Sequence, residues 1–232
     1  MTTLRADRRF SWLRSVIAVY AKDWHSELRT RYAISALLMF VVTTIAIIMF
    51  SLGSEDAPPE VLSGMLWVVV FFGAMSGLAR TFVMEEERGT SMTLQLLTGP
   101  SAVYFGKLLF NLVLVFGLNS VTVVLYLLLI NGFVVKTVSI FLVTLILGSI
   151  GFAAAATIIA AIIARASTKG TLYPVLSFPI LLPLLLTVIN ATRMAGEGAA
   201  FSEAYGEFQL LISYIVVVIA ASTVVFDYVW KD

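Results

Sequence analysis

Six apolar runs, each long enough to cross a lipid bilayer, divide this chain. A membrane-spanning helix needs about 20 apolar residues at a rise of about 1.5 Å per residue. Charged residues make up only 12% of the 232 residues, against about a quarter in soluble domains. The sequence therefore predicts an all-α integral membrane protein that forms a single permease-like domain over residues 1–232. We expect the spans at residues 33–52, 61–84, 104–131, 137–164, 172–190 and 208–230.

Residues 10–32, which precede the first run, have the pattern of an amphipathic helix. Leu13, Ile17, Tyr20 and Trp24 recur at spacings of three and four, while charged residues occupy other faces. A basic helix with tryptophans is typical of a segment that lies along a membrane surface. We therefore expect an interfacial helix, and the alternative is a helix that packs on a soluble partner.

A polar insert separates the second and third runs. Its charged residues are Glu85, Glu86, Glu87 and Arg88. Each would cost roughly 2.5 to 3.5 kcal/mol at the centre of the bilayer, so the insert must lie at a membrane surface. After Gly89, Thr90 or Ser91 can cap a short helix that Gly99 and Pro100 end. We expect a short surface helix with a charged N-terminal end, and the alternative is a loop with a solubilising run of charges.

The basic residues favour one orientation of the spans. Thirteen of the 15 Lys and Arg residues fall in the N-terminal region, the insert, the loop after the fourth run or the C-terminus. Only Lys136 and Arg193 fall on the opposite side. Because short cytoplasmic loops are rich in basic residues, we expect both termini and the insert in the cytoplasm. The net charge of +1 gives no overall field that would recruit nucleic acid.

The chain lacks the residue combinations that catalysis needs. It has no cysteine and a single histidine, His25, so neither a catalytic thiol nor a histidine-rich metal site is expected. The stretch from Gly99 to Lys107 has the wrong spacing for a phosphate-binding loop. The spans also lack paired carboxylates. We therefore expect a protein that is not an enzyme, with any ATP bound by a partner.

Two spans contain residues that are unusual in a membrane. Asn111 and Asn119 in the third span should face protein, either as hydrogen bonds between helices or as the lining of a path. Pro174, Pro179 and Pro183 should kink the fifth span and leave backbone carbonyls free for neighbouring helices or for a cavity.

This layout resembles the permease subunits of type-two ABC exporters, and two motifs narrow the resemblance. The first motif consists of Glu86, Gly89, Thr90, a leucine-rich turn, Gly99-Pro100, Ala102-Val103-Tyr104 and Gly106-Lys107. It is similar to the central motif of the CcmB family, the haem-exporter permease subunits of cytochrome c maturation. The second motif consists of Arg165, Lys169-Gly170, Leu176, Pro179, Pro183 and Leu184. It is similar to that family's loop into the fifth span.

The resemblance implies a subunit of a larger complex in the bacterial inner membrane. Its partners would be an ABC ATP-binding subunit, a haem-handling membrane subunit and a second copy of the chain. In the family the complex serves the delivery of haem to a periplasmic chaperone, so haem would be a ligand that the complex handles. We expect residues 85–90 to be the ATPase-coupling segment, because a short helix between two spans can pass on a rigid-body motion. The alternatives are a type-two ABC permease for a drug, lipid or glycan, and a non-transporting membrane scaffold for an ATPase.

Overall fold

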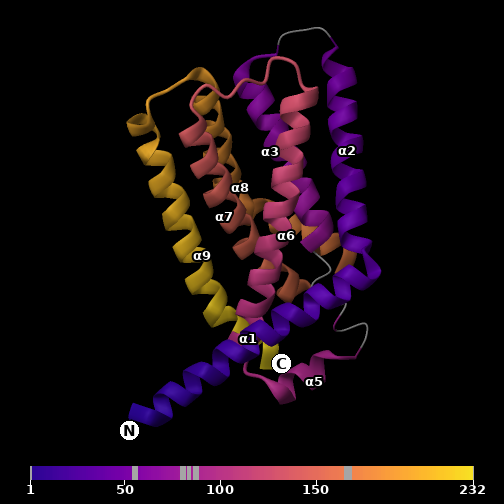
Figure 1. The fold of residues 1–232 in the computed structure, drawn as a ribbon, viewed down its shortest axis with the longest axis vertical. Helices are drawn as coiled ribbons and strands as arrows, with labels where there is room; N and C mark the ends of the chain where they lie inside the picture. Colours follow the sequence, from indigo (N-terminus) through magenta and orange to yellow (C-terminus); the bar gives the residue numbers. More distant parts are fainter. Residues whose placement is uncertain are drawn as a thin grey trace.

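The computed structural model describes residues 2–53, 57–78, 82, 85, 89–164 and 169–231, and all regular structure in these ranges is helical. The helices are α1 (Thr2–Thr30), α2 (Tyr32–Leu52), α3 (Pro59–Leu78), α5 (Ser91–Leu97), α6 (Pro100–Leu129), α7 (Val138–Ala164), α8 (Lys169–Glu197) and α9 (Tyr205–Lys231), with a 3-10 turn at Phe201–Ala204. Figure 1 shows the long helices as a bundle, with α1 and α5 at one end.

Six of these helices are long and apolar enough to cross a membrane, namely α2, α3, α6, α7, α8 and α9. The predicted all-α membrane fold with six spans is thereby confirmed. Individual bounds differ from the predicted ones, most at the end of the fifth span, which we placed at residue 190 whereas α8 ends at Glu197. We expected the second span to reach residue 84, but α3 ends at Leu78, and the residues between it and α5 lie outside the described part except for Phe82, Glu85, Gly89 and Thr90.

Helix α7 forms the centre of the bundle and is mostly buried, whereas α2 and α9 are mostly exposed. Glycines in α7 allow the neighbouring helices to approach it closely. A Cβ atom at Gly148 would lie 2.7 Å from the Trp67 ring of α3, and one at Gly151 would lie 2.7 Å from Leu184 of α8. Without a side chain at these positions the three helices pack in direct contact, which favours association in lipid.

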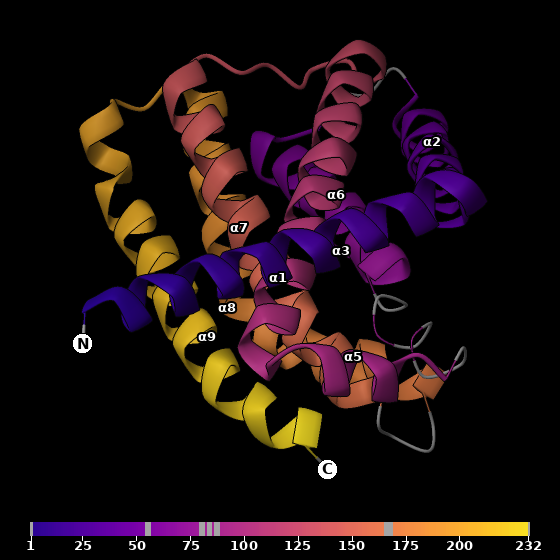
Figure 2. The same cartoon turned by 60° about the horizontal axis from the view of Figure 1, so that its bottom comes forward.

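Helix α1 lies across one end of the bundle and packs on α6 (Figures 1 and 2). It begins at Thr2, earlier than the predicted residue 10. The two helices lie very close at Gly106 of α6, where a Cβ atom would lie 2.7 Å from the Cβ atom of Val19 and 2.9 Å from the carbonyl oxygen of Val16. Both ends of the chain are found at this end of the bundle, as an even number of spans requires (Figure 1).

A sharp corner joins α1 to α2. Arg31 turns the chain with a φ of 51°, in the left-handed region that residues other than glycine rarely adopt. The buried carboxylate of Glu27 accepts a hydrogen bond from the backbone N–H of Ile34, with a length of 3.0 Å. This bond satisfies one of the free N–H groups in the first turn of α2. The corner therefore fixes the direction of α2 relative to α1.

Candidate functional site

Lys107 is a fully buried lysine in a membrane helix. Gly99 has extended backbone angles and Pro100 occupies the first turn of α6, so the helix begins early enough to place Lys107 about two turns inside it. Its Nζ atom lies 3.1 Å from Oδ2 of Asp23 in α1 and 3.3 Å from Oε1 of Glu85. One ammonium group thus joins α6 to α1 and to the segment that follows α3.

Lys22 completes a balanced set of charges. Its ammonium group pairs with the carboxylate of Asp23 at 3.2 Å and also with that of Glu85. We call Lys22, Asp23, Glu85 and Lys107 the charge cluster. A buried charge is tolerated only when it is paired and hydrogen-bonded, and here two cations meet two carboxylates that are both buried. The cluster can therefore hold three segments of the chain in a fixed arrangement.

Glu85 also closes the turn that leads into α5. The hydroxyl of Thr90 donates to Oε2 of Glu85 at 2.5 Å, and the backbone N–H of Thr90 donates to the carbonyl oxygen of Glu85 at 3.0 Å. Gly89 makes the turn possible with a φ of 66°. We expected the side chain of Thr90 or Ser91 to cap α5. Thr90 stands at the cap position without a capping hydrogen bond, because its hydroxyl is engaged by Glu85.

The charge cluster keeps Glu85 ionised. Burial alone raises the pKa of this carboxyl group, but the charge of Lys107 and the hydrogen bonds from Lys22 and Thr90 outweigh burial and lower the pKa from 4.5 to about 2. The carboxylate therefore stays charged at neutral pH. This fits a structural ion pair, whereas a proton carrier needs a pKa close to the working pH.

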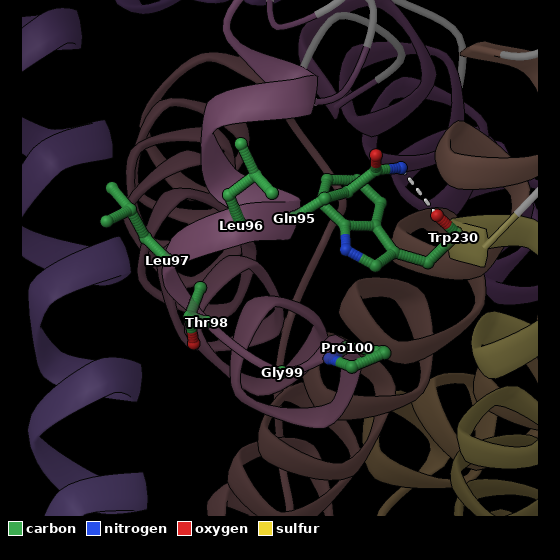
Figure 3. A pocket seen from close by; sticks show the side chains of 7 residues that line it. All are labelled: Gln95, Leu96, Leu97, Thr98, Gly99, Pro100 and Trp230. Atoms are coloured by element: carbon green, nitrogen blue, oxygen red, sulfur yellow. Dashed lines mark hydrogen bonds between the residues drawn. The ribbon is translucent and has the colours of Figure 1, made fainter.

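Helix α5 presents an apolar surface outside the bundle. Met92, Leu96 and Leu97 are 71%, 84% and 77% exposed. On another side of the helix, Nε2 of Gln95 donates to the carbonyl oxygen of Trp230 in α9 at 2.6 Å (Figure 3). A cavity of about 540 Å³ lies between α5, the turn into α6 and the end of α9. The helix is thus attached to the bundle and still offers exposed side chains.

Half of the predicted coupling segment falls within the described part of the chain. Glu85, Gly89 and Thr90 form the turn before α5, whereas residues 86–88 lie outside the described residues. The role of the segment in coupling stays a prediction. Within the described ranges, no three His, Asp or Glu side chains gather where a metal ion could bind.

Both predicted intramembrane asparagines contact α7. The side-chain amide of Asn111 donates to the hydroxyl of Thr157 at 2.9 Å, and that of Asn119 donates to the hydroxyl of Ser149 at 2.7 Å. All four residues are buried. These are hydrogen bonds between helices, one of the two roles we considered, and they join α6 to the central helix.

The three prolines lie within α8, which stays helical through all of them. The carbonyl oxygen of Ile180, three residues before Pro183, accepts a hydrogen bond from the hydroxyl of Tyr214 in α9 at 3.0 Å. Pro183 removes the N–H partner of the Pro179 carbonyl, whereas the Ile180 carbonyl keeps Leu184 as its partner within the helix, so this bond does not test the predicted free carbonyls. That the prolines matter for transport stays a prediction.

Sequence reasoning missed three members of the charge cluster, because Lys22, like Asp23, was taken only as a charged residue on the amphipathic helix. We counted Lys107 as a basic residue of the insert region and as part of a motif, and we treated Asp23 as one polar residue of an amphipathic helix. One signal was available: a lysine inside an apolar helix needs a partner of opposite charge. The identity of that partner was beyond reach, because Asp23 is 84 residues away in the sequence.

Comparison with known families covers nearly the whole chain. The family model described as CcmB protein matches residues 14–228. The chain belongs to the CcmB family. No curated protein matches it. Members of the CcmB family are haem-exporter ABC permease subunits of cytochrome c maturation, so this chain is a transporter membrane subunit and its complex includes an ATP-binding partner.

The matched range contains every member of the charge cluster, the turn before α5 and the whole of α5. It ends before Trp230, whose carbonyl group accepts the hydrogen bond from Gln95. The match therefore covers most of the bundle and the whole insert. It leaves the contact between α5 and the last turn of α9 without an assigned role.

Proposed function

We propose that this CcmB-family chain couples ATP hydrolysis by its partner subunit to the export of haem, or to the release of a haem-loaded chaperone, during cytochrome c maturation. The observation that carries the proposal is the charge cluster beside α5. It connects a helix with an exposed apolar surface to both α1 and α6 through buried ion pairs. A force applied to α5 would therefore reach two elements of the bundle.

The ATP-binding subunit would contact α5 and the turn before it. Met92, Leu96 and Leu97 expose apolar area of the kind that marks a protein interface. The charges at positions 86–88 would then orient the contact. Since the basic residues favour the cytoplasm for this end of the bundle, the ATPase would bind on the cytoplasmic side of a bacterial inner membrane.

Two further partners complete the proposed complex. A haem-handling membrane subunit would supply the residues that bind haem, because this chain contains a single histidine, on the exposed side of α1. A second copy of the chain would pair with the second subunit of an ATPase dimer. The family match supports this proposal over export of a drug, lipid or glycan. A scaffold that only transmits the state of the ATPase would make the same contacts with the ATP-binding subunit.

Deletion of the gene tests the function. Cytochromes of the c type carry covalently bound haem, which survives a denaturing gel, whereas b-type cytochromes bind haem without covalent attachment. The deletion strain should lose every haem-stained band while a reduced-minus-oxidised spectrum still shows b-type haem, and a plasmid copy should restore the bands. Normal haem-stained bands in the deletion strain would contradict the proposal.

A further inference from the structure

The last turn of α9 ends beside α5, and the side chain of Gln95 joins them. The final four carbonyl groups of a helix have no donor within that helix. One of these groups belongs to Trp230, and it accepts the hydrogen bond from Gln95 at 2.6 Å. The C-terminal end of a helix also carries partial negative charge, which favours a donor at this position. In Figure 3 the side chain of Gln95 reaches toward Trp230, while Leu97 lies on the opposite side.

Aromatic rings bring the same end of α9 close to Phe82, which precedes Glu85 in the chain. Phe226 and Trp230 stack with ring centroids 5.5 Å apart, and both contact the ring of Phe82, at 5.6 and 6.3 Å. Phe82 lies 5.0 Å from the ammonium group of Lys107, in reach of a cation–π interaction. The end of α9 therefore contacts the chain on both sides of Glu85. Phe82 makes the contact before Glu85, and Gln95 makes the contact after it.

Helix α9 leads from this contact to the middle of the protein. It packs along α7, the most buried of the six spans. Phe226 also packs on Tyr104 of α6, with ring centroids 5.4 Å apart. A displacement of α5 that pulled on the end of α9 would thus reach α7 by a route that is separate from the charge cluster.

We propose that Gln95 is a positioning residue: its amide holds α5 against the C-terminal turn of α9, so that α9 moves when the ATPase displaces α5. The inference rests on the proposed function, because it takes the ATPase to act on α5. The hydrogen-bond donor and its place on α5 are the features that matter. Glutamate at position 95 keeps the size but removes the donor and adds a negative charge at a negative helix end. Lysine keeps a donor and adds a favourable charge.

A distance measurement tests the positioning without any assumption about transport. The chain has no cysteine, so Met92→Cys and Tyr228→Cys can carry two spin labels at exposed sites of α5 and α9. In the full-length protein in lipid nanodiscs, the parent and Gln95→Lys should each give one narrow distance by pulsed electron resonance. Gln95→Glu should give a broader distribution shifted to longer distances. An unchanged distribution in Gln95→Glu, or equal broadening in Gln95→Lys, would overturn the inference.

A second measurement tests the consequence for transport. In cells, Gln95→Glu should lose the haem-stained c-type bands although the ATP-binding subunit still copurifies, and Gln95→Lys should retain the bands. Normal bands in Gln95→Glu would overturn the link between α9 and transport. Normal bands after deletion of the whole gene would instead refute the proposed function, and the spin-label distances would still decide whether Gln95 positions α5.

Discussion

At the scale of single residues, Lys107 contributes most to the proposed site because it is the shared partner of two buried carboxylates. Among the residues that the structure describes, its removal leaves Asp23 and Glu85 with only the partly exposed Lys22 to neutralise them. Breaking a buried ion pair by removing one partner is far more costly than breaking an exposed pair. The two lysines of the cluster therefore provide a matched comparison.

We predict that Lys107→Met lowers the free energy of unfolding by about 3 to 5 kcal/mol, whereas Lys22→Met lowers it by about 1 kcal/mol or less. Denaturation of the detergent-solubilised protein, followed by tryptophan fluorescence, measures both values. The triple variant Lys107→Met, Asp23→Asn and Glu85→Gln should recover most of the loss, because no unpaired charge stays buried. Equal stability of the two single variants would show that burial of Lys107 is unimportant.

The contribution of Glu85 to the free energy of unfolding should depend on pH. Its pKa is lowered on folding, so its contribution to stability is complete above about pH 4.5 and is lost as the pH falls from 4.5 toward 2. At about 1.36 kcal/mol per pKa unit, the lowering corresponds to about 3 kcal/mol. The difference in unfolding free energy between the parent and Glu85→Gln should shrink across this window. A constant difference between pH 5 and pH 2.5 would mean that the carboxylate gains nothing from its partners.

At the scale of helices, the contact between α1 and α6 depends on the missing side chain at Gly106. A methyl group there would meet the backbone carbonyl of Val16 at 2.9 Å, and a backbone atom cannot rotate away as a side chain can. Overpacking of this kind costs about 1 to 3 kcal/mol. This loss of stability should be greatest at the contact between α1 and α6.

We predict that Gly106→Ala loosens α1, seen as faster hydrogen exchange of its backbone amides. Gly117 in the same helix is the control, because a Cβ atom there would meet nothing within 4 Å. Gly117→Ala should leave exchange in α1 unchanged and stabilise α6 slightly, since alanine favours a helix by about 1 kcal/mol over glycine. Slow exchange in Gly106→Ala would show that α1 can shift to accept the methyl group.

The sequence predicted the long helices well and their contacts poorly. A run of about 20 apolar residues with few charges has one main solution in a bilayer, so the spans could be located, although the predicted ends of the second and fifth spans, residues 84 and 190, differ from the observed Leu78 and Glu197. The end of α5 before Gly99 followed from local turn chemistry, whereas α6 begins at Pro100, four residues before the predicted start of the third span. The ion pairs from Lys107 and the hydrogen bond from Gln95 to Trp230 join distant segments. No local pattern encodes them.

At the scale of the whole molecule, the end of the bundle that bears α1, α5 and both termini should face the cytoplasm. The charge counts support this orientation, since 13 of the 15 basic residues belong to that side. Met92 in α5 and Glu203 in the turn before α9 are exposed. They provide one labelling site near each end of the bundle.

We predict that an impermeant thiol reagent added to spheroplasts labels Glu203→Cys, because this residue lies at the end of the bundle that faces the periplasm. Met92→Cys should be labelled only after the membrane is permeabilised. The parent chain has no cysteine, so it serves as the control that should not be labelled. Labelling of Met92→Cys in intact spheroplasts would reverse the orientation and with it the side on which the ATPase binds.

The ion pair between Asp23 and Lys107 also sets an order of events during synthesis. The two residues are 84 positions apart. At about 5 to 20 residues per second, the ribosome adds Lys107 roughly 4 to 17 seconds after Asp23. The segments that become α2 and α3 are made within that interval, so Asp23 must wait for its partner Lys107 until both have been synthesised. Glu85 is made in the same interval, so the ion pairs that join α1, α6 and the segment before α5 can form only after Lys107 has been made.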